Sequence, residues 1–138
     1  MAAIFLLSVA NTQLTLLKDA IWKHMTKLTP MERIWFIVNI IPQGTVLLYG
    51  IVADLAGLPG RARYVSRALK LAPETLALPW HRVINSQGRI SFAKNTEPFQ
   101  TQQELLRLEG ITVNVGKISL SQYQWKPDLA TLVMTLPF

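Results

Sequence analysis

The 138-residue chain contains no cysteine. A disulfide bond, a thiolate-bound zinc ion and a thiol nucleophile are therefore excluded for this sequence. Histidine is almost as rare, because only His24 and His81 are present, and we expect no metal site built from histidines. Acidic residues are also few: 8 of them stand against 14 lysines and arginines, which leaves a formal net charge of +6. This excess of positive charge is compatible with binding to nucleic acid or to an anionic membrane surface.

Length and hydrophobicity indicate one folded domain. Half of the residues are hydrophobic and 16% are charged, and this composition is typical of a globular protein. The chain is long enough to form one hydrophobic core. The apolar run at residues 2–10 is too short to span a membrane. It ends in Ser8-Val9-Ala10, which resembles the end of a signal peptide, but no Lys or Arg precedes it. We expect a packing segment or an accessory extension there, and no membrane partner.

Two helices separated by a glycine-rich turn are expected in the first half of the domain. Gly57-Leu58-Pro59-Gly60 separates a short helix within residues 46–56 from a second helix at 61–71. A helix, a glycine turn and a basic helix are typical of a helix-turn-helix, although many such helix pairs never contact DNA. The second helix concentrates positive charge, since no acidic residue interrupts Arg61, Arg63, Arg67 and Lys70.

Three further elements complete the expected fold. Thr29, Pro30 and Glu32 form a helix-start pattern, and the buried stripe that follows is Ile34, Trp35, Val38 and Ile41. A polar loop at 93–98 precedes a helix at 100–108, which Gly110 closes. Residues 111–120 alternate in polarity and predict a small β-hairpin. The fold class is therefore mostly α with a small β-hairpin.

Several motifs occur in a specific order and spacing. They are Ile41-Pro42-x-Gly44-x-Val46-x-x-Tyr49-Gly50, then Ala53, Gly57, Pro59 and Ala62-Arg63-x-Val65, then Pro79-Trp80-His81-Arg82-Val83, and finally Leu105-Leu106-x-x-Glu109-Gly110. Together they resemble the O6-alkylguanine-DNA alkyltransferase family over about residues 31–126. The Pro-Trp-His-Arg-Val version is typical of its alkyltransferase-like subgroup.

The resemblance implies a domain organisation. It predicts a winged helix-turn-helix domain at 29–127, with an N-terminal extension at 1–28 and a C-terminal tail at 128–138. The hairpin after Gly110 would be the wing or pack beside it. Two departures from the family are visible: Ala72-Pro73 replaces Asn-Pro, and the stretch from Ser91 to Pro98 replaces the Ser-Gly-Gly lid.

Position 80 decides the chemistry that the resemblance implies. An alkyltransferase displaces the alkyl group with a thiolate, which a neighbouring histidine makes reactive. Trp80 occupies the place of that cysteine, and an indole offers only an N–H donor. His81 and Glu109 match the family's histidine and glutamate but have nothing to activate. We expect them to form a buried hydrogen-bonded pair that orients the loop, with Arg82 tying the loop down, and we expect no enzymatic activity.

The same resemblance assigns binding roles. Trp80 would be the aromatic wall of a lesion pocket that also contains Tyr49, His81, Glu109 and Phe92, with Lys94 beside Phe92 as a possible closing residue. Arg63 would be the finger that enters the base stack. The DNA-binding residues would be Arg61, Tyr64, Ser66, Arg67 and Lys70. Tyr64 is a bulky departure, because alkyltransferases prefer small residues on this face.

These residues predict lesion recognition without repair. The implied partner is double-stranded DNA containing O6-alkylguanine, which the protein would flip and hand to the damage-recognition proteins of nucleotide excision repair. We expect a cytoplasmic monomer that needs no cofactor. Two alternatives remain open: an active alkyltransferase that uses His81 as nucleophile, and a winged-helix transcription regulator with sequence-specific binding.

Overall fold

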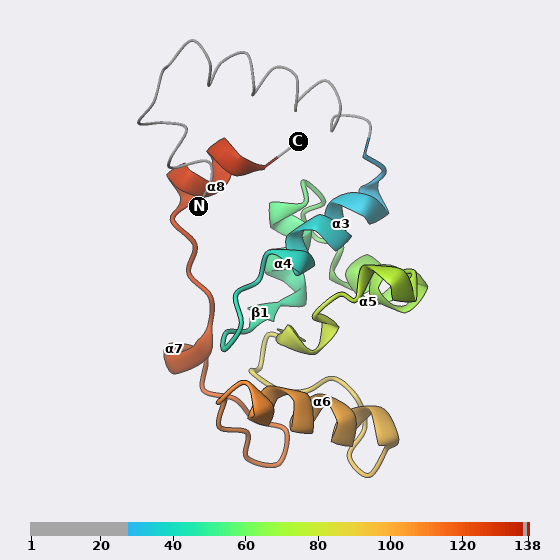
Figure 1. Ribbon diagram of the computed structural model, residues 1–138, viewed down its shortest axis with the longest axis vertical. Helices are drawn as coiled ribbons and strands as arrows, with labels where there is room; N and C mark the ends of the chain where they lie inside the picture. Colours follow the sequence, from blue (N-terminus) through green and yellow to red (C-terminus); the bar gives the residue numbers. More distant parts are fainter. Residues whose placement is uncertain (1–27, 137) are drawn as a thin grey trace. The chain divides into compact units, whose positions relative to one another are not determined.

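The computed structural model describes residues 28–136 and 138 (Figure 1). The expected extension at 1–28, including its apolar start, therefore lies almost entirely outside the described residues. The chain divides into two units, residues 30–125 and a second unit of residues 1–29 with 126–138. Helix α8 (Leu129–Thr135) belongs to the second unit. No described helix is long and apolar enough to cross a membrane.

The larger unit is mostly helical with one short sheet (Figure 1). Its first half holds three helices and its second half is built around one long helix. In chain order its elements are α3 (Pro30–Asn39), β1 (Leu47–Leu48), α4 (Tyr49–Leu55), α5 (Ala62–Leu71), the 3-10 turns η1 (Glu74–Leu76) and η2 (Trp80–Arg82), β2 (Val83–Ile84), α6 (Glu97–Leu108) and α7 (Leu120–Tyr123).

Helix α3 follows the predicted stripe with one exchange. Ile34, Val38 and Ile41 are buried as expected, and Ile37 is buried with them. Trp35 is half-buried, and its indole Nε1–H donates to the carbonyl of Ala68 at 2.8 Å. A buried indole N–H needs such a partner. The bond ties α3 to α5 and so helps to fix the second helix of the predicted pair.

Helices α4 and α5 form the predicted helix-turn-helix. Gly57 and Gly60 take the left-handed backbone region, at φ 75° and 78°, where glycine has no steric penalty. Leu58 N donates to Ala53 O at 2.8 Å and closes the turn. On α5, Val65 and Ala68 are fully buried. The opposite face of this basic helix therefore points outward.

The sheet is a parallel pair that the sequence did not predict. Leu47 pairs with Val83 and Leu48 with Ile84. Each strand has only two residues, which is too short to show a hydrophobic alternation. The sheet positions two segments of the site, because β1 leads directly into Tyr49 and β2 follows directly after residues 80–82.

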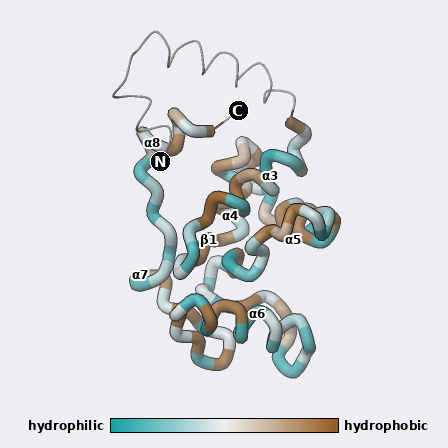
Figure 2. Tube along the Cα trace, viewed as in Figure 1, coloured by the Kyte–Doolittle hydropathy of each residue, from teal (hydrophilic) through white to brown (hydrophobic). Residues whose placement is uncertain are grey.

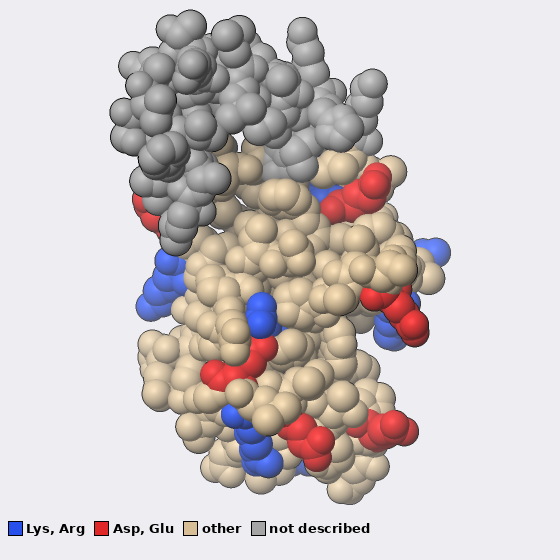
Figure 3. Space-filling view, in the orientation of Figure 1, with Lys and Arg blue, Asp and Glu red and all other residues tan. Residues whose placement is uncertain are grey.

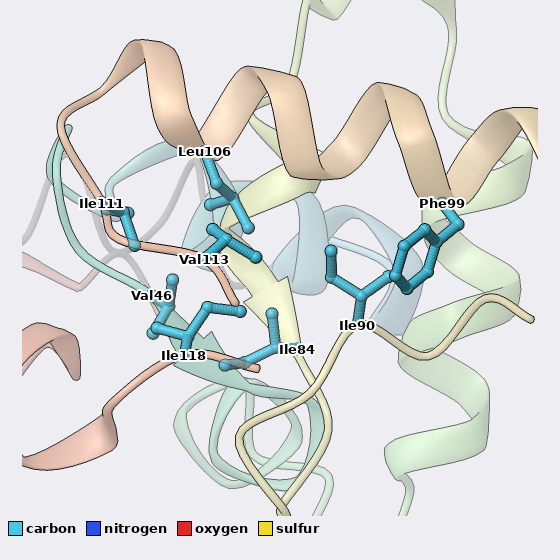
Figure 4. Close-up of a cluster of buried hydrophobic side chains, with 8 residues drawn as sticks. All are labelled: Val46, Ile84, Ile90, Phe99, Leu106, Ile111, Val113 and Ile118. Atoms are coloured by element: carbon cyan, nitrogen blue, oxygen red, sulfur yellow. The ribbon is translucent and has the colours of Figure 1, made fainter. Parts of the chain in front are cut away.

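A second core lies beneath α6 (Figure 4). Side chains from β2, from α6 and from loops point toward one another there, and they are Val46, Ile84, Ile90, Phe99, Leu106, Ile111, Val113 and Ile118. Along α6, hydrophobic and polar segments alternate, as one buried face requires (Figure 2). The helix starts at Glu97, earlier than predicted, because Thr96 Oγ1 caps it by accepting from Phe99 N.

The predicted hairpin is shorter than its alternation suggested. Asn114 and Lys117 form a single antiparallel bridge around a two-residue turn, with backbone bonds of 3.0 Å in both directions. The mostly helical fold class is confirmed, but the only named strands among the described residues are β1 and β2. The chain after the turn pairs instead with residues 88–90: Ile90 N donates to Gly116 O, and Ile118 N donates to Gly88 O.

Candidate nucleic-acid interface

A cavity of about 460 Å³ opens between α5, the start of α4, the 80–82 turn and the start of α6. Pockets for small organic groups span roughly 300–1,000 Å³, so an extruded purine is within its capacity. Most of the lining is apolar or aromatic, with a few polar groups at the edge. The lining residues are Tyr49, Ser66, Leu69, Lys70, Trp80, Phe92, Glu97, Pro98 and Thr101.

Trp80 forms an aromatic wall of this cavity. Its ring is half-buried and stands edge-on to Phe92, with 6.2 Å between ring centroids and 83° between planes. A similar edge contact of 6.2 Å and 90° links it to His81. The two neighbours fix the indole plane while its exposed part faces the cavity. Stacking of a nucleobase on such a ring contributes about 1–3 kcal/mol.

Tyr49 stands at another wall. As the first residue of α4, directly after β1, it is positioned by the parallel strand pair. Burial raises the pKa of its hydroxyl, and a hydrogen bond with the Ser91 side chain only partly offsets this effect. The hydroxyl therefore stays protonated at neutral pH and is available as a hydrogen-bond donor.

His81 and Glu109 lie behind the aromatic wall and do not line the cavity. They form the expected pair, with His81 Nε2 and Glu109 Oε2 at 2.5 Å and side chains only 12% and 9% exposed. Arg82 completes the group: its Nε and Nη2 donate to Glu109 at 2.8–3.0 Å, and its Nη1 donates to Ile41 O at 2.8 Å. Gly44 N also donates to Glu109 at 2.9 Å. One carboxylate therefore joins three distant segments of the chain.

The same contacts set the charge of Glu109. Burial would raise its pKa, but the bonds from Arg82, Gly44 and His81 outweigh burial and lower it from 4.5 to about 2. With its carboxylate ionised and fully engaged, and with no thiol to relay a proton to, the group has a positioning role. It holds the loop that carries Trp80.

This depressed pKa predicts an acid-sensitive fold. The Glu109 contribution is complete above the unfolded-state pKa near 4.5 and is lost as pH falls from about 5 to about 2. The free energy of unfolding should therefore decrease as pH falls through this range. Urea unfolding at several pH values measures it. A Glu109→Gln variant should show a flatter profile, and an equal slope in both proteins would contradict the assignment.

The basic helix α5 presents a stripe toward the cavity. Arg63, Ser66 and Lys70 follow each other at spacings of three and four residues, so they share one side of the helix. Ser66 and Lys70 line the cavity, and exposed Arg63 lies one turn before them. Among the described residues, no ion-pair partner engages Arg63. Its position fits the predicted finger, a role that stays a prediction.

The remaining predicted DNA contacts divide into two groups. Arg67 is exposed on the outward face, beside the stripe. Tyr64 is half-buried at the flank, where the Arg61 guanidinium lies 5.2 Å from its ring centroid. This cation–π contact turns the bulky ring along the helix surface.

Some lining residues were missed in the sequence. Leu69 carries no polar group that would single it out, and the sequence analysis divides Glu97, Pro98 and Thr101 between a polar loop and the helix after it. A signal was available, because Thr96 followed by Glu97-Pro98 is a helix-start pattern. Lys94, expected near the pocket, is exposed and does not line it. Within the described residues, no group of three potential ligands could hold a metal ion.

The fold and the cavity define a class of protein: a helix-turn-helix domain with a pocket of base size beside its basic helix. The sequence profile of the "6-O-methylguanine DNA methyltransferase, DNA binding domain" matches residues 29–111. The chain belongs to this family.

Known relatives agree with that membership. The "DNA base-flipping protein" of Vibrio parahaemolyticus is 46% identical over 98 residues, covering 70% of this chain and 96% of the relative. Alkyltransferase-like protein 1 of Schizosaccharomyces pombe is 44% identical over 93 residues, covering 63% and 85%. The crystal structure of S. pombe Atl1 in complex with damaged DNA containing O6-carboxymethylguanine superimposes with a TM-score of 0.64 at 37% identity, covering 71% of this chain and 95% of that one.

Proposed function

We propose that this protein recognises O6-alkylguanine in double-stranded DNA by turning the damaged base into the cavity beside Trp80, and that it leaves the alkyl group in place. One observation carries the proposal. An indole forms the wall of a base-sized cavity in a chain of this family that has no cysteine. Alkyl transfer needs a sulfur nucleophile at that wall, whereas stacking needs only the flat ring.

The interface around the cavity supports base extrusion. Unpairing and unstacking a base costs a few kcal/mol, and the cost is lower for a damaged base. Arg63 lies on the stripe that leads to the cavity and can occupy the vacated place in the stack. The outward cations of α5 supply attraction to the phosphate backbone. Relatives named as base-flipping proteins, and a relative crystallised with damaged DNA, add to this support.

A binding comparison tests the proposal. We expect a duplex with one O6-methylguanine to bind at least about tenfold more tightly than the same unmodified duplex, because a damaged base costs less to unpair and unstack, and a difference of about 1.4 kcal/mol changes affinity tenfold. Fluorescence anisotropy at fixed salt measures both affinities. Equal affinity combined with strong sequence preference would instead identify a transcription regulator. A stable mass gain after incubation with the methylated duplex would identify alkyl transfer, with His81 as the candidate acceptor.

A lesion that is held but not repaired requires another system to remove it. We extend the proposal to the damage-recognition proteins of nucleotide excision repair as the receiving partners, with the protein acting as a monomer in the cytoplasm. The proposed handover to these repair proteins is supported by the chemistry, because reversible binding leaves the adduct on the DNA.

A further inference from the structure

Two basic residues outside α5 have no role so far. Arg89 and Lys117 lie directly opposite each other in an antiparallel bridge. The two backbone hydrogen bonds that flank this bridge, 2.9 and 2.8 Å long, run between the neighbouring residues on either side. Arg89 and Lys117 therefore form a non-hydrogen-bonded antiparallel pair. In such a pair the two Cα atoms are about 4.5 Å apart, and the side chains are closer than in a hydrogen-bonded pair.

The pairing brings like charges together without compensation. Both side chains are exposed, and no carboxylate among the described residues forms an ion pair with either. Like charges directly across an antiparallel pair destabilise it. An anion held between the two side chains would remove this repulsion. On the face shown in Figure 3, lysines and arginines are scattered, with acidic residues among them.

The pair is close to the rim of the cavity along the chain. Phe92, three residues after Arg89, lines the cavity. Three residues of chain span at most about 11 Å, which bounds the separation of the Arg89 and Phe92 Cα atoms. Ile90 is 5% exposed and belongs to the core beneath α6, whereas Arg89 before it is exposed, so the Arg89 side chain points away from that core. Lys117 projects to the same side as Arg89, because directly opposite residues of a strand pair do so.

We propose that Arg89 and Lys117 form a second phosphate-binding site for DNA, on the Phe92 side of the cavity, in addition to the contacts from α5. The inference rests on the proposed function for its ligand. The guanidinium can bind phosphate oxygens in a fork, and the ammonium contributes a point charge. A backbone phosphate held there anchors the strand next to the position that the flipped base would leave.

The test is the salt dependence of DNA binding. Dissociation constants are measured across a range of KCl concentrations for the wild type, Arg89→Gln, Lys117→Gln and the double variant, on the O6-methylguanine duplex and on the unmodified duplex. Each lost phosphate contact should reduce the slope of log affinity against log salt by about 0.9. The preference for the lesion should stay constant, because phosphate contacts do not read the base.

A charge-conserving control separates a phosphate site from a structural effect. Arg89→Lys combined with Lys117→Arg should retain the wild-type slope, and circular dichroism checks that every variant is folded. An unchanged slope in the folded Gln variants, with intact lesion preference in the wild type, would overturn the phosphate site alone. A wild type without lesion preference would overturn the proposed function, while a reduced slope on unmodified DNA would still support the phosphate site.

Discussion

Replacing Glu109 by alanine is expected to lower the free energy of unfolding by about 3–5 kcal/mol. Losing one partner of a buried ion pair costs this much because the other charge remains buried without compensation. Here the abandoned charge is Arg82, whose side chain is 16% exposed, and Gly44 N loses its acceptor as well. Domains of this size have about 5–15 kcal/mol of total stability, so the variant should unfold at much lower urea concentration.

A neighbouring carboxylate provides the matched control. Glu104 lies on α6, which ends just before Glu109, but it is exposed, so Glu104→Ala should change stability by less than about 0.5 kcal/mol. Glu109→Gln should fall between the two, since an amide oxygen can still accept from Gly44 while the charge is lost. A loss below about 1 kcal/mol in Glu109→Ala would show that the network is not a structural tie.

Replacing Arg63 by alanine is expected to weaken binding to an O6-methylguanine duplex by about 10- to 100-fold. The finger would stabilise the flipped state by filling the gap in the stack, and that state costs a few kcal/mol to reach. The exposed position of Arg63 means that its loss should leave the fold unchanged. Anisotropy titrations against the lesion duplex and the unmodified duplex give the ratio of the two dissociation constants.

Arg67 is the control for this effect. It is exposed one turn further along α5, where a phosphate contact is the simpler role. Arg67→Ala should weaken both duplexes by a similar factor and leave their ratio unchanged. Arg63→Ala should reduce the ratio. If the two variants behave alike, Arg63 is another backbone contact and the finger belongs elsewhere on the protein.

The helix-turn-helix could be predicted because its signals are local. Glycines at the turn and the buried periodicity around Val65 and Ala68 are readable in a single segment. The cap at Thr96 was equally local, yet the proline after it was interpreted as loop. The parallel strand pair could not be predicted, because β1 and β2 have two residues each and lie far apart in the chain.

The site divides in the same way. Motif order placed Trp80 and Tyr49 in one pocket, Phe92 was predicted there from the stretch that replaces the lid, and the structure brings these three together. It did not show that His81 and Glu109 lie behind the wall, since adjacency in sequence to Trp80 says nothing about which side of the ring a neighbour takes. The cavity's far edge, at Pro98 and Thr101, depends on how α6 packs, a tertiary property.

The two-residue turn between Asn114 and Lys117 leads directly into the pairing of residues 116–118 with residues 88–90. Strand side chains alternate between two faces, so a one-residue slip in this pairing would exchange the orientations of Lys117 and Ile118. An ammonium group would then enter the interior and an isoleucine would meet water. The register of this pairing therefore decides which of the two side chains meets water.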